Sequence, residues 1–175
     1  MKSLILYYSR TGNTANVAEV IHKSTKSDIE EVKDRADRSG VIGYIKAGKD
    51  TIFGAEADIE GIKSDINNYG SIFIGGPVWV MKPATPVTTL IKRLDLKNKQ
   101  VVLFVTCGGN PGKSLEVMSD LVMKNGGLVL HRFFIKTGKL DAAGVVQAAQ
   151  EEVAKLKQAV SKNKTVVQTS EDMTV

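Results

Sequence analysis

The sequence predicts an α/β fold with a doubly wound, five-stranded parallel sheet covered by helices on both faces. Short apolar runs alternate along the chain with longer segments whose apolar residues recur at helical spacing. Two of the runs, at residues 69–75 and 100–106, are almost unbroken, as expected for central strands buried on both faces. Strands joined through helices are parallel, and this spacing suits the spatial order 2-1-3-4-5, with strands numbered along the chain.

Length and composition place the chain among globular proteins. Its 175 residues fit one domain with a sizeable core, and 42% of them are hydrophobic. No apolar run approaches the roughly 20 residues of a membrane span, and the first residues lack a signal-peptide pattern. We therefore expect a cytoplasmic protein with no membrane association. The single cysteine, Cys107, excludes an intrachain disulfide and a cysteine-ligated cluster built from this chain alone.

The net charge of +5 is concentrated in one segment. Between residues 82 and 113 a single acid, Asp95, accompanies six bases: Lys82, Lys92, Arg93, Lys97, Lys99 and Lys113. This segment predicts a basic 82–113 face that attracts an acidic partner, although solvated helix and turn positions would have the same composition. It lacks the interleaved aromatic residues or arginine-rich helix that nucleic-acid binding requires, so we expect no nucleic-acid partner.

The first strand, expected at residues 2–8, leads directly into a polar loop and then a helix at residues 14–25. The loop reads Ser9-Arg10-Thr11-Gly12-Asn13-Thr14. A helix N-terminus presents unpaired N–H groups and the positive end of the helix dipole, so it favours an anion. The hydroxyl groups here can donate to phosphate oxygens, and Gly12 permits a positive φ. We interpret this loop as a phosphate site; the alternative is an ordinary capped turn.

A second strand is expected at residues 28–32, where the sequence DIEEV is more polar and suits an edge position. The segment that follows, residues 33–66, is too long for a plain connection between a strand and a helix. We expect it to be helical around residues 41–49 and otherwise a surface excursion.

The third strand, expected at residues 69–75, precedes the loop GGPVWVMKP, which holds the only tryptophan, Trp79. In the order 2-1-3-4-5, ligands bind beyond the carboxyl ends of strands one and three. A large aromatic side chain there suggests stacking on a planar ligand, and Gly75 and Gly76 permit a close backbone approach. The alternative is that Trp79 caps the core. A helix at residues 83–94 follows, with prolines in its first turn.

The fourth strand, residues 100–106, ends in a third loop, Thr106-Cys107-Gly108-Gly109-Asn110-Pro111-Gly112-Lys113-Ser114. Its last three residues resemble the end of a nucleotide-binding P-loop. The motif also requires a glycine five positions before Gly112, where Cys107 stands, and it normally follows the first strand. We therefore reject the NTPase interpretation.

The remaining elements complete the pattern. We expect a helix at residues 114–125 that ends at a glycine pair, a fifth strand at 128–135 and an amphipathic helix at 142–160. Residues 161–175 are polar with scattered valines and are expected to form a loosely held tail. The expected organisation is a domain over residues 1–160 followed by this tail.

Together, the three loops make residues 1–160 resemble a short-chain member of the flavodoxin family, whose members bind FMN in loops after these strands. The resemblance implies a phosphate contact from Ser9, Arg10, Thr11, Gly12, Asn13 and Thr14. It implies that the isoalloxazine ring is contacted by Gly75, Gly76, Pro77, Val78 and Trp79. It places Thr106, Cys107, Gly108, Gly109 and Gly112 beside the pyrimidine side of the ring.

Two departures from the family pattern bear on function. The third loop has no aromatic residue to cover the second face of the flavin. That face would then be open to a hydride donor or a quinone. Alternatively, Tyr44 or Phe53 from the 33–66 segment would cover it. Flavodoxins are also commonly acidic, whereas this chain is basic near the second and third loops.

The resemblance favours an electron-transfer protein that binds FMN non-covalently and serves redox partner proteins or a small-molecule donor or acceptor. The glycine-backed loops would permit a peptide rearrangement near the flavin N5 on reduction, which would stabilise a semiquinone and make one-electron steps possible. The alternatives are an NAD(P)H-dependent FMN or quinone reductase of the same fold, and a flavin-free interaction module. We identify no catalytic residue, because His22 and His131 lack the neighbours of a triad. We expect no metal site, because the acids at 56, 58, 60 and 65 are too loosely spaced.

Overall fold

The structure is a computed structural model that describes residues 2–36 and 56–172. Five parallel strands form the sheet: β1 (Ser3–Tyr7), β2 (Asp28–Glu31), β3 (Ser71–Trp79), β5 (Gln100–Cys107) and β6 (Leu128–Lys136). Their order is β2-β1-β3-β5-β6, and a two-residue strand, β4 (Lys82–Pro83), pairs antiparallel with the end of β3. Once β4 is set aside, this is the predicted order 2-1-3-4-5, so the predicted fold class is confirmed.

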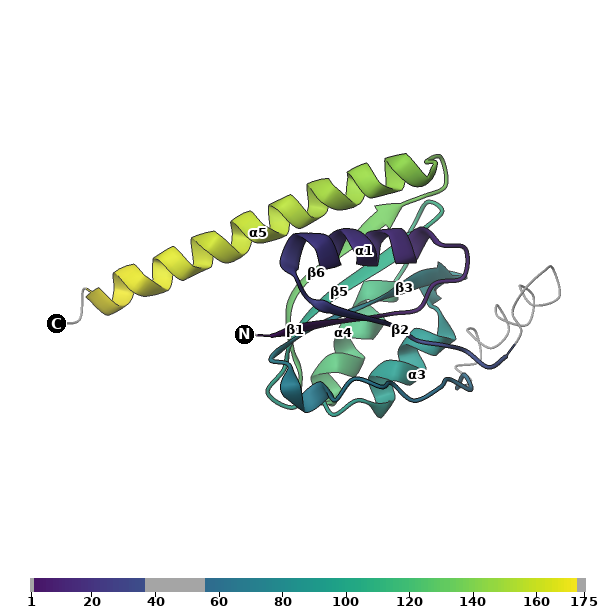
Figure 1. The fold of residues 1–175 in the computed structure, drawn as a ribbon, viewed down its shortest axis with the longest axis horizontal. Helices are drawn as coiled ribbons and strands as arrows, with labels where there is room; N and C mark the ends of the chain where they lie inside the picture. Colours follow the sequence, from purple (N-terminus) through teal and green to yellow (C-terminus); the bar gives the residue numbers. More distant parts are fainter. Residues whose placement is uncertain (1, 37–55, 173–175) are drawn as a thin grey trace.

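Helices cover both faces of the sheet (Figure 1). One face carries α1 (Asn13–Thr25) and α5 (Ala142–Asp172), which pack against each other, and the opposite face carries α3 (Thr85–Arg93) and α4 (Ser114–Lys124). Each face has its own hydrophobic core. Leu6, Ile74 and Leu103 face the α3–α4 side, whereas Ile5, Phe104 and Phe133 face the α1–α5 side. The alternation follows from the two-residue period of a strand.

The third strand is longer than predicted. β3 continues through Gly75, Gly76, Pro77 and Val78 to Trp79, so these residues belong to the sheet, and the prediction that they form a loop is wrong. Pro77 is tolerated in a central strand because β1 has already ended at Tyr7, and Pro77 pairs only with Thr106 of β5 among the parallel strands. The carboxyl end of β3 therefore extends beyond the end of β1 while it stays paired with β5.

A two-residue turn, Val80–Met81, joins β3 to β4, and both residues have positive φ values of 47° and 62°. This geometry is that of a type I′ hairpin turn, which normally uses asparagine, aspartate or glycine. A β-branched valine at positive φ is a strained conformation. The sequence Val-Met carries no turn signal, which is why this hairpin could not be predicted.

The long segment after β2 is anchored where it leaves and rejoins the fold. Asp34 pairs with Ile59 in an isolated antiparallel bridge, and the Ala57 N–H donates to the buried Thr89 hydroxyl at 2.9 Å. A short 3₁₀ helix, η1 (Ile66–Asn68), then leads into β3. The predicted helix at 41–49, with Tyr44 and Phe53, lies outside the described residues.

The last helix is longer than the predicted range of 142–160. α5 continues to Asp172, through most of the residues expected to form a polar tail, and its C-terminal part extends past the end of the sheet (Figure 1). The division into a 1–160 domain and a tail remains a prediction. Among the described helices, none is both long enough and apolar enough to cross a membrane.

Candidate functional site

The predicted phosphate loop connects β1 to α1 at the carboxyl edge of the sheet. Gly12 is the N-cap residue of α1 and has a φ of 90°, which confirms the predicted positive φ. No atom of the described residues lies within 4 Å of the position that a Cβ at Gly12 would occupy. The Ser9 hydroxyl accepts from the Ala15 N–H at 3.2 Å, while Thr11 is exposed. The loop thus leads into a helix N-terminus, and whether it holds a phosphate group stays a prediction.

Arg10 and Asn13 are half-buried in this loop, and residues 9–14 include no carboxylate that would repel an anion. Thr14 lies deeper than predicted, because its side chain is only 1% exposed. Its hydroxyl group is 2.8 Å from the equally buried Thr106 hydroxyl at the end of β5. Thr14 and Thr106 therefore connect the first and third loops, 92 residues apart in sequence.

Replacing Thr14 with valine is expected to lower the free energy of unfolding by about 1–3 kcal/mol, because the partner hydroxyl loses its buried hydrogen bond. The double variant Thr14→Val/Thr106→Val removes both polar groups and should recover most of that loss. Urea denaturation of the two single variants and the double variant gives the coupling energy. Additive losses would show that the two hydroxyl groups do not depend on each other.

Two glycines near the end of β3 are required by packing. A Cβ at Gly75 would overlap the ring of Phe104, reaching within 2.5 Å of its Cδ2, and a Cβ at Gly76 would overlap the Cγ2 of Val87. The Gly75 carbonyl accepts from the Tyr8 N–H at 3.1 Å. The backbone here is held in the ladder between β1 and β5. Glycine is therefore required at both positions to leave room for core side chains, and pairing with the neighbouring strands holds the peptide groups here in place.

Trp79 lies at the end of β3 with 7% of its surface exposed and belongs to the core on the α3–α4 side. Its ring meets Tyr8 edge to face, with the ring centroids 5.7 Å apart. Pro77 and Val78 are half-buried beside it. The observed packing matches the alternative in which Trp79 caps the core, and its stacking against a flavin stays a prediction. Tyr8 could not be assigned to the site from the sequence, because nothing in an apolar strand end indicates what an aromatic ring at that position will contact.

The hairpin at the end of β3 contacts the third loop directly. The Lys113 N–H donates to the Met81 carbonyl at 3.2 Å. Gly112 has a φ of 56°, and a Cβ there would lie 2.7 Å from the Met81 Cβ and 2.8 Å from its Cα. The second and third predicted loops are thus packed together, with Gly112 as the residue that permits it. The side chains at the tip, Val80 and Met81, are about half exposed.

The third loop presents an exposed backbone beyond β5. Gly108 and Gly109 are exposed, and among residues 2–36 and 56–172 nothing lies within 4 Å of where their Cβ atoms would be. Cys107 is buried at the end of the strand, and burial raises the pKa of its thiol, so the thiol is protonated near neutral pH and unsuited to nucleophilic attack. On the other side, the Thr137 N–H donates to the Cys107 carbonyl at 2.8 Å. The loop is therefore held between the hairpin and the turn after β6.

Ser114 opens α4 and is fully buried, which is incompatible with the phosphate or metal contact that a P-loop serine would make. Its Oγ has no hydrogen-bond partner among the described residues. An unsatisfied buried hydroxyl destabilises a fold.

Replacing Ser114 with alanine is therefore expected to leave the flavin-free protein as stable or to raise its free energy of unfolding by up to about 1 kcal/mol. Thermal or urea denaturation measures this effect. A loss of more than 1 kcal/mol would mean that the hydroxyl has a partner in solution.

The bases of residues 82–113 do not form the single face that was predicted. Lys97 and Lys99 precede β5 and Lys113 follows it, so they lie at opposite ends of an eight-residue strand, roughly 25 Å apart. Lys99 donates to the Tyr69 carbonyl at 2.7 Å, and Lys92 pairs with Glu56 at 3.5 Å. Only the two end residues of the segment, Lys82 and Lys113, lie near the hairpin and the third loop.

No metal-binding group is found in the described part of the chain, where no three His, Cys, Asp or Glu side chains gather. His22 contacts the Ser27 carbonyl oxygen through Nδ1 at 2.6 Å, at the C-terminal end of α1. His131 lies on β6, away from Cys107 at the end of β5.

Comparison with known proteins identifies the family. The model of a family described as flavodoxin matches residues 2–140. A flavodoxin-like domain-containing protein, BilS, from Clostridioides difficile is 30% identical over 161 residues, which span 89% of this chain and 76% of BilS.

Two solved structures have the same fold. The crystal structure of a flavoprotein in complex with FMN from Lactobacillus acidophilus is 32% identical, with a TM-score of 0.63 over 76% of this chain and 92% of that one. A Fusobacterium nucleatum flavodoxin bound to flavin mononucleotide is 14% identical, with a TM-score of 0.52 over 91% of this chain and 99% of that one, a likeness of fold alone. The sheet order and the family match agree: the chain belongs to the flavodoxin family.

Proposed function

We propose that the protein binds FMN non-covalently and transfers electrons between redox partners. The observation that carries this proposal is the loop between β1 and α1. It combines a helix N-terminus, Gly12 at a φ of 90°, an exposed Thr11 and no carboxylate. These features fit a dianionic phosphate group. The relative from Lactobacillus acidophilus, crystallised with FMN, supports the same cofactor here.

The contacts to the rest of the cofactor are proposed from the positions of the other two segments. Exposed backbone at Gly108 and Gly109 would approach one edge of the ring, since no side chain in the described part of the chain fills the space in front of either residue. Trp79 and Val78 would border the ring from the end of β3. Bound FMN would supply the redox chemistry, exchanging electrons in one-electron steps, and the protein would orient it and exclude water.

Contacts between the three segments of the proposed site restrict how their backbones can move. The hydrogen bond between Thr14 and Thr106 and the packing of Gly112 against Met81 join all three segments of the proposed site. Contacts of this kind lower the entropic cost of ordering loops on binding. Because Gly75 and Gly76 are held by packing, a peptide rearrangement on reduction would have to occur elsewhere, and the strained Val80–Met81 turn is the remaining candidate in this segment.

A second candidate is an NAD(P)H-dependent reductase of FMN or quinones. The observation that favours it is the exposed third loop, which contains no aromatic side chain to cover the second face of a flavin. A nicotinamide or quinone ring could stack on such a face. The two candidates share the FMN site and differ in the electron donor.

The deciding experiment is a flavin titration followed by anaerobic reduction. Quenching of FMN fluorescence by the purified protein tests cofactor binding, and a protein that fails to quench it would refute both candidates in favour of a flavin-free interaction module. Stepwise reduction of the holoprotein should show two resolved one-electron potentials in a carrier. Rapid bleaching by NADPH or NADH would instead identify a reductase.

A further inference from the structure

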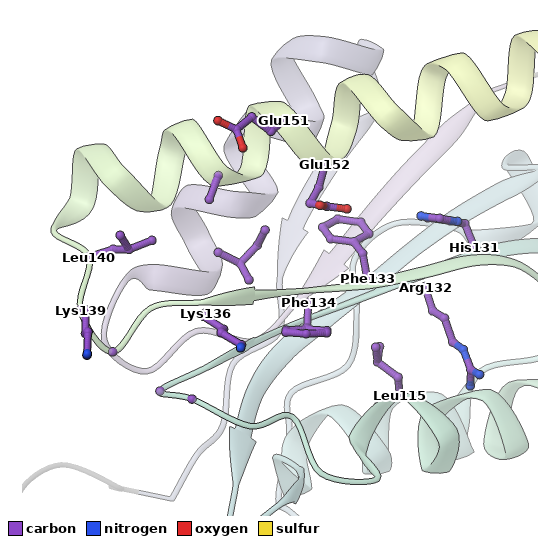
Figure 2. Close-up of a pocket in the computed structure, with 15 residues that line it drawn as sticks. Leu115, His131, Arg132, Phe133, Phe134, Lys136, Lys139, Leu140, Glu151 and Glu152 are labelled. Atoms are coloured by element: carbon purple, nitrogen blue, oxygen red, sulfur yellow. The ribbon is translucent and has the colours of Figure 1, made fainter.

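A groove of about 930 Å³ runs along β6, next to the third loop (Figure 2). Its wall includes Gly108 and Gly109, whose exposed backbone is proposed above to approach the flavin. β6 is an edge strand, and no strand in the described part of the chain pairs with its outer side. The groove therefore adjoins the proposed redox site and shares Gly108 and Gly109 with it.

The two faces of β6 differ in their exposure. Phe133 and Ile135 point toward α5 and are buried, whereas Arg132, Phe134 and Lys136 on the other face are exposed. Figure 2 shows these three side chains on the side of the strand nearer to Leu115 of α4. Phe134 is 38% exposed and Leu140, at the end of the groove, is 42% exposed. An apolar surface rimmed by charge is typical of an interface.

The exposed charges on this side of the groove are positive. Arg132, Lys136 and Lys139 form no salt bridge with a described acid. The two acids of the groove, Glu151 and Glu152, come from α5 on the opposite wall (Figure 2). Glu152 pairs with Lys155 at 2.6 Å, and Glu151 accepts from Gln147 at 3.3 Å. The positive charges of Arg132, Lys136 and Lys139 are therefore available to attract an anionic group of another molecule.

We propose that this groove is the docking surface for an acidic redox partner protein, a proposal that rests on the FMN-dependent electron transfer proposed above. Carboxylates of the partner would meet Arg132, Lys136 and Lys139, while apolar side chains would contact Phe134 and Leu140. Complementary charge raises association rates and fixes orientation. A partner docked here lies against Gly108 and Gly109, and so beside the proposed flavin.

A second copy of the chain fits this surface less well. Antiparallel pairing of β6 with β6 about a two-fold axis at Arg132 would place the two arginines directly opposite each other. An axis at Phe134 would place Arg132 opposite Lys136. Like charges directly opposite each other on adjacent strands are destabilising, so charge disfavours self-association in these two registers, whereas an acidic partner meets no such repulsion.

The test uses the FMN-loaded protein and a plant-type ferredoxin, an acidic redox protein, as the probe. The ferredoxin is reduced beforehand, freed of excess reductant and mixed with the oxidised holoprotein in a stopped-flow instrument, where bleaching of the flavin reports electron transfer. The variant Arg132→Glu/Lys136→Glu/Lys139→Glu should lower the second-order rate constant at low ionic strength by about tenfold or more. High salt should remove most of that difference.

The matched control is Lys26→Glu/Lys97→Glu/Lys124→Glu, which changes the net charge equally at the opposite end of the sheet, where α1, α3 and α4 end. Its rate constant should stay within about twofold of the wild type. Equal losses in both variants, or no loss in either, would overturn the proposal. So would a wild-type dimer in light scattering that the groove variant dissociates. FMN fluorescence quenching by each variant separates these outcomes from a failure of the FMN proposal itself.

Phe134→Ala keeps the charge unchanged and tests the apolar part of the interface. We expect a rate constant at least threefold lower, with a salt dependence parallel to that of the wild type. An unchanged rate constant would contradict an apolar contact at this position.

Discussion

Replacing Gly112 with alanine is expected to lower the free energy of unfolding by about 2–5 kcal/mol. A side chain at its positive φ costs about 1–2 kcal/mol, and overlap with the Met81 backbone adds roughly 1–3 kcal/mol. Domains are stabilised by only about 5–15 kcal/mol, so this loss is large. Because Gly112 joins the hairpin to the third loop, FMN affinity should fall as well. Urea denaturation without FMN and fluorescence titration with FMN measure the two effects.

Gly109 provides the control within the same loop. Its φ is not in the positive region, and no atom lies within 4 Å of the position of its Cβ. Gly109→Ala should therefore change the free energy of unfolding by less than about 1 kcal/mol, and in the stabilising direction if the backbone is unchanged. A comparable loss in Gly109→Ala and Gly112→Ala would show that contact with Met81 is not what requires glycine at position 112.

The fold was predictable because its signals are local and repeated. Each buried strand is a short apolar run, each helix has an apolar stripe, and parallel strands joined by helices leave few arrangements of the sheet. The first loop was also predictable, because positive φ at Gly12 and the start of α1 both follow from neighbouring residues. The features that depend on neighbouring residues are therefore the ones that the sequence predicts.

The parts that sequence could not predict depend on contacts between distant residues. Whether Gly75 faces a ligand or a core ring depends on Phe104, 29 positions away. Whether the Thr14 hydroxyl bonds to a phosphate or to another hydroxyl depends on Thr106. Similarly, the basic segment 82–113 looked continuous in sequence, but β5 carries the chain from one end of the sheet to the other. Only Lys82 and Lys113 of that segment lie near the third loop, where Lys136 of β6, which pairs with Cys107, joins them.

The second large effect concerns the ligand itself: FMN should bind at least about 100-fold more tightly than riboflavin, which lacks the phosphate group. Charge-assisted hydrogen bonds contribute about 1.5–3 kcal/mol each, so two of them from the loop at residues 9–14 amount to roughly 3–6 kcal/mol. Since 1.4 kcal/mol is a tenfold change in affinity, the expected ratio is roughly 100 to 10,000. Titration of the flavin-free protein with each flavin, followed by fluorescence, gives the two dissociation constants.

Thr11 separates a phosphate contact from a general effect on the fold, because its side chain is exposed in this loop. Thr11→Ala should weaken FMN binding about tenfold and leave riboflavin binding nearly unchanged, since only FMN presents a charged phosphate oxygen for the Thr11 hydroxyl to bind. Ser24→Ala removes a hydroxyl group at the opposite end of α1 and should change neither affinity. Equal affinities for FMN and riboflavin in the wild type would mean that the N-terminus of α1 does not hold the phosphate. The retained affinity would then have to come from the ring contacts alone, at the end of β3 and in the third loop.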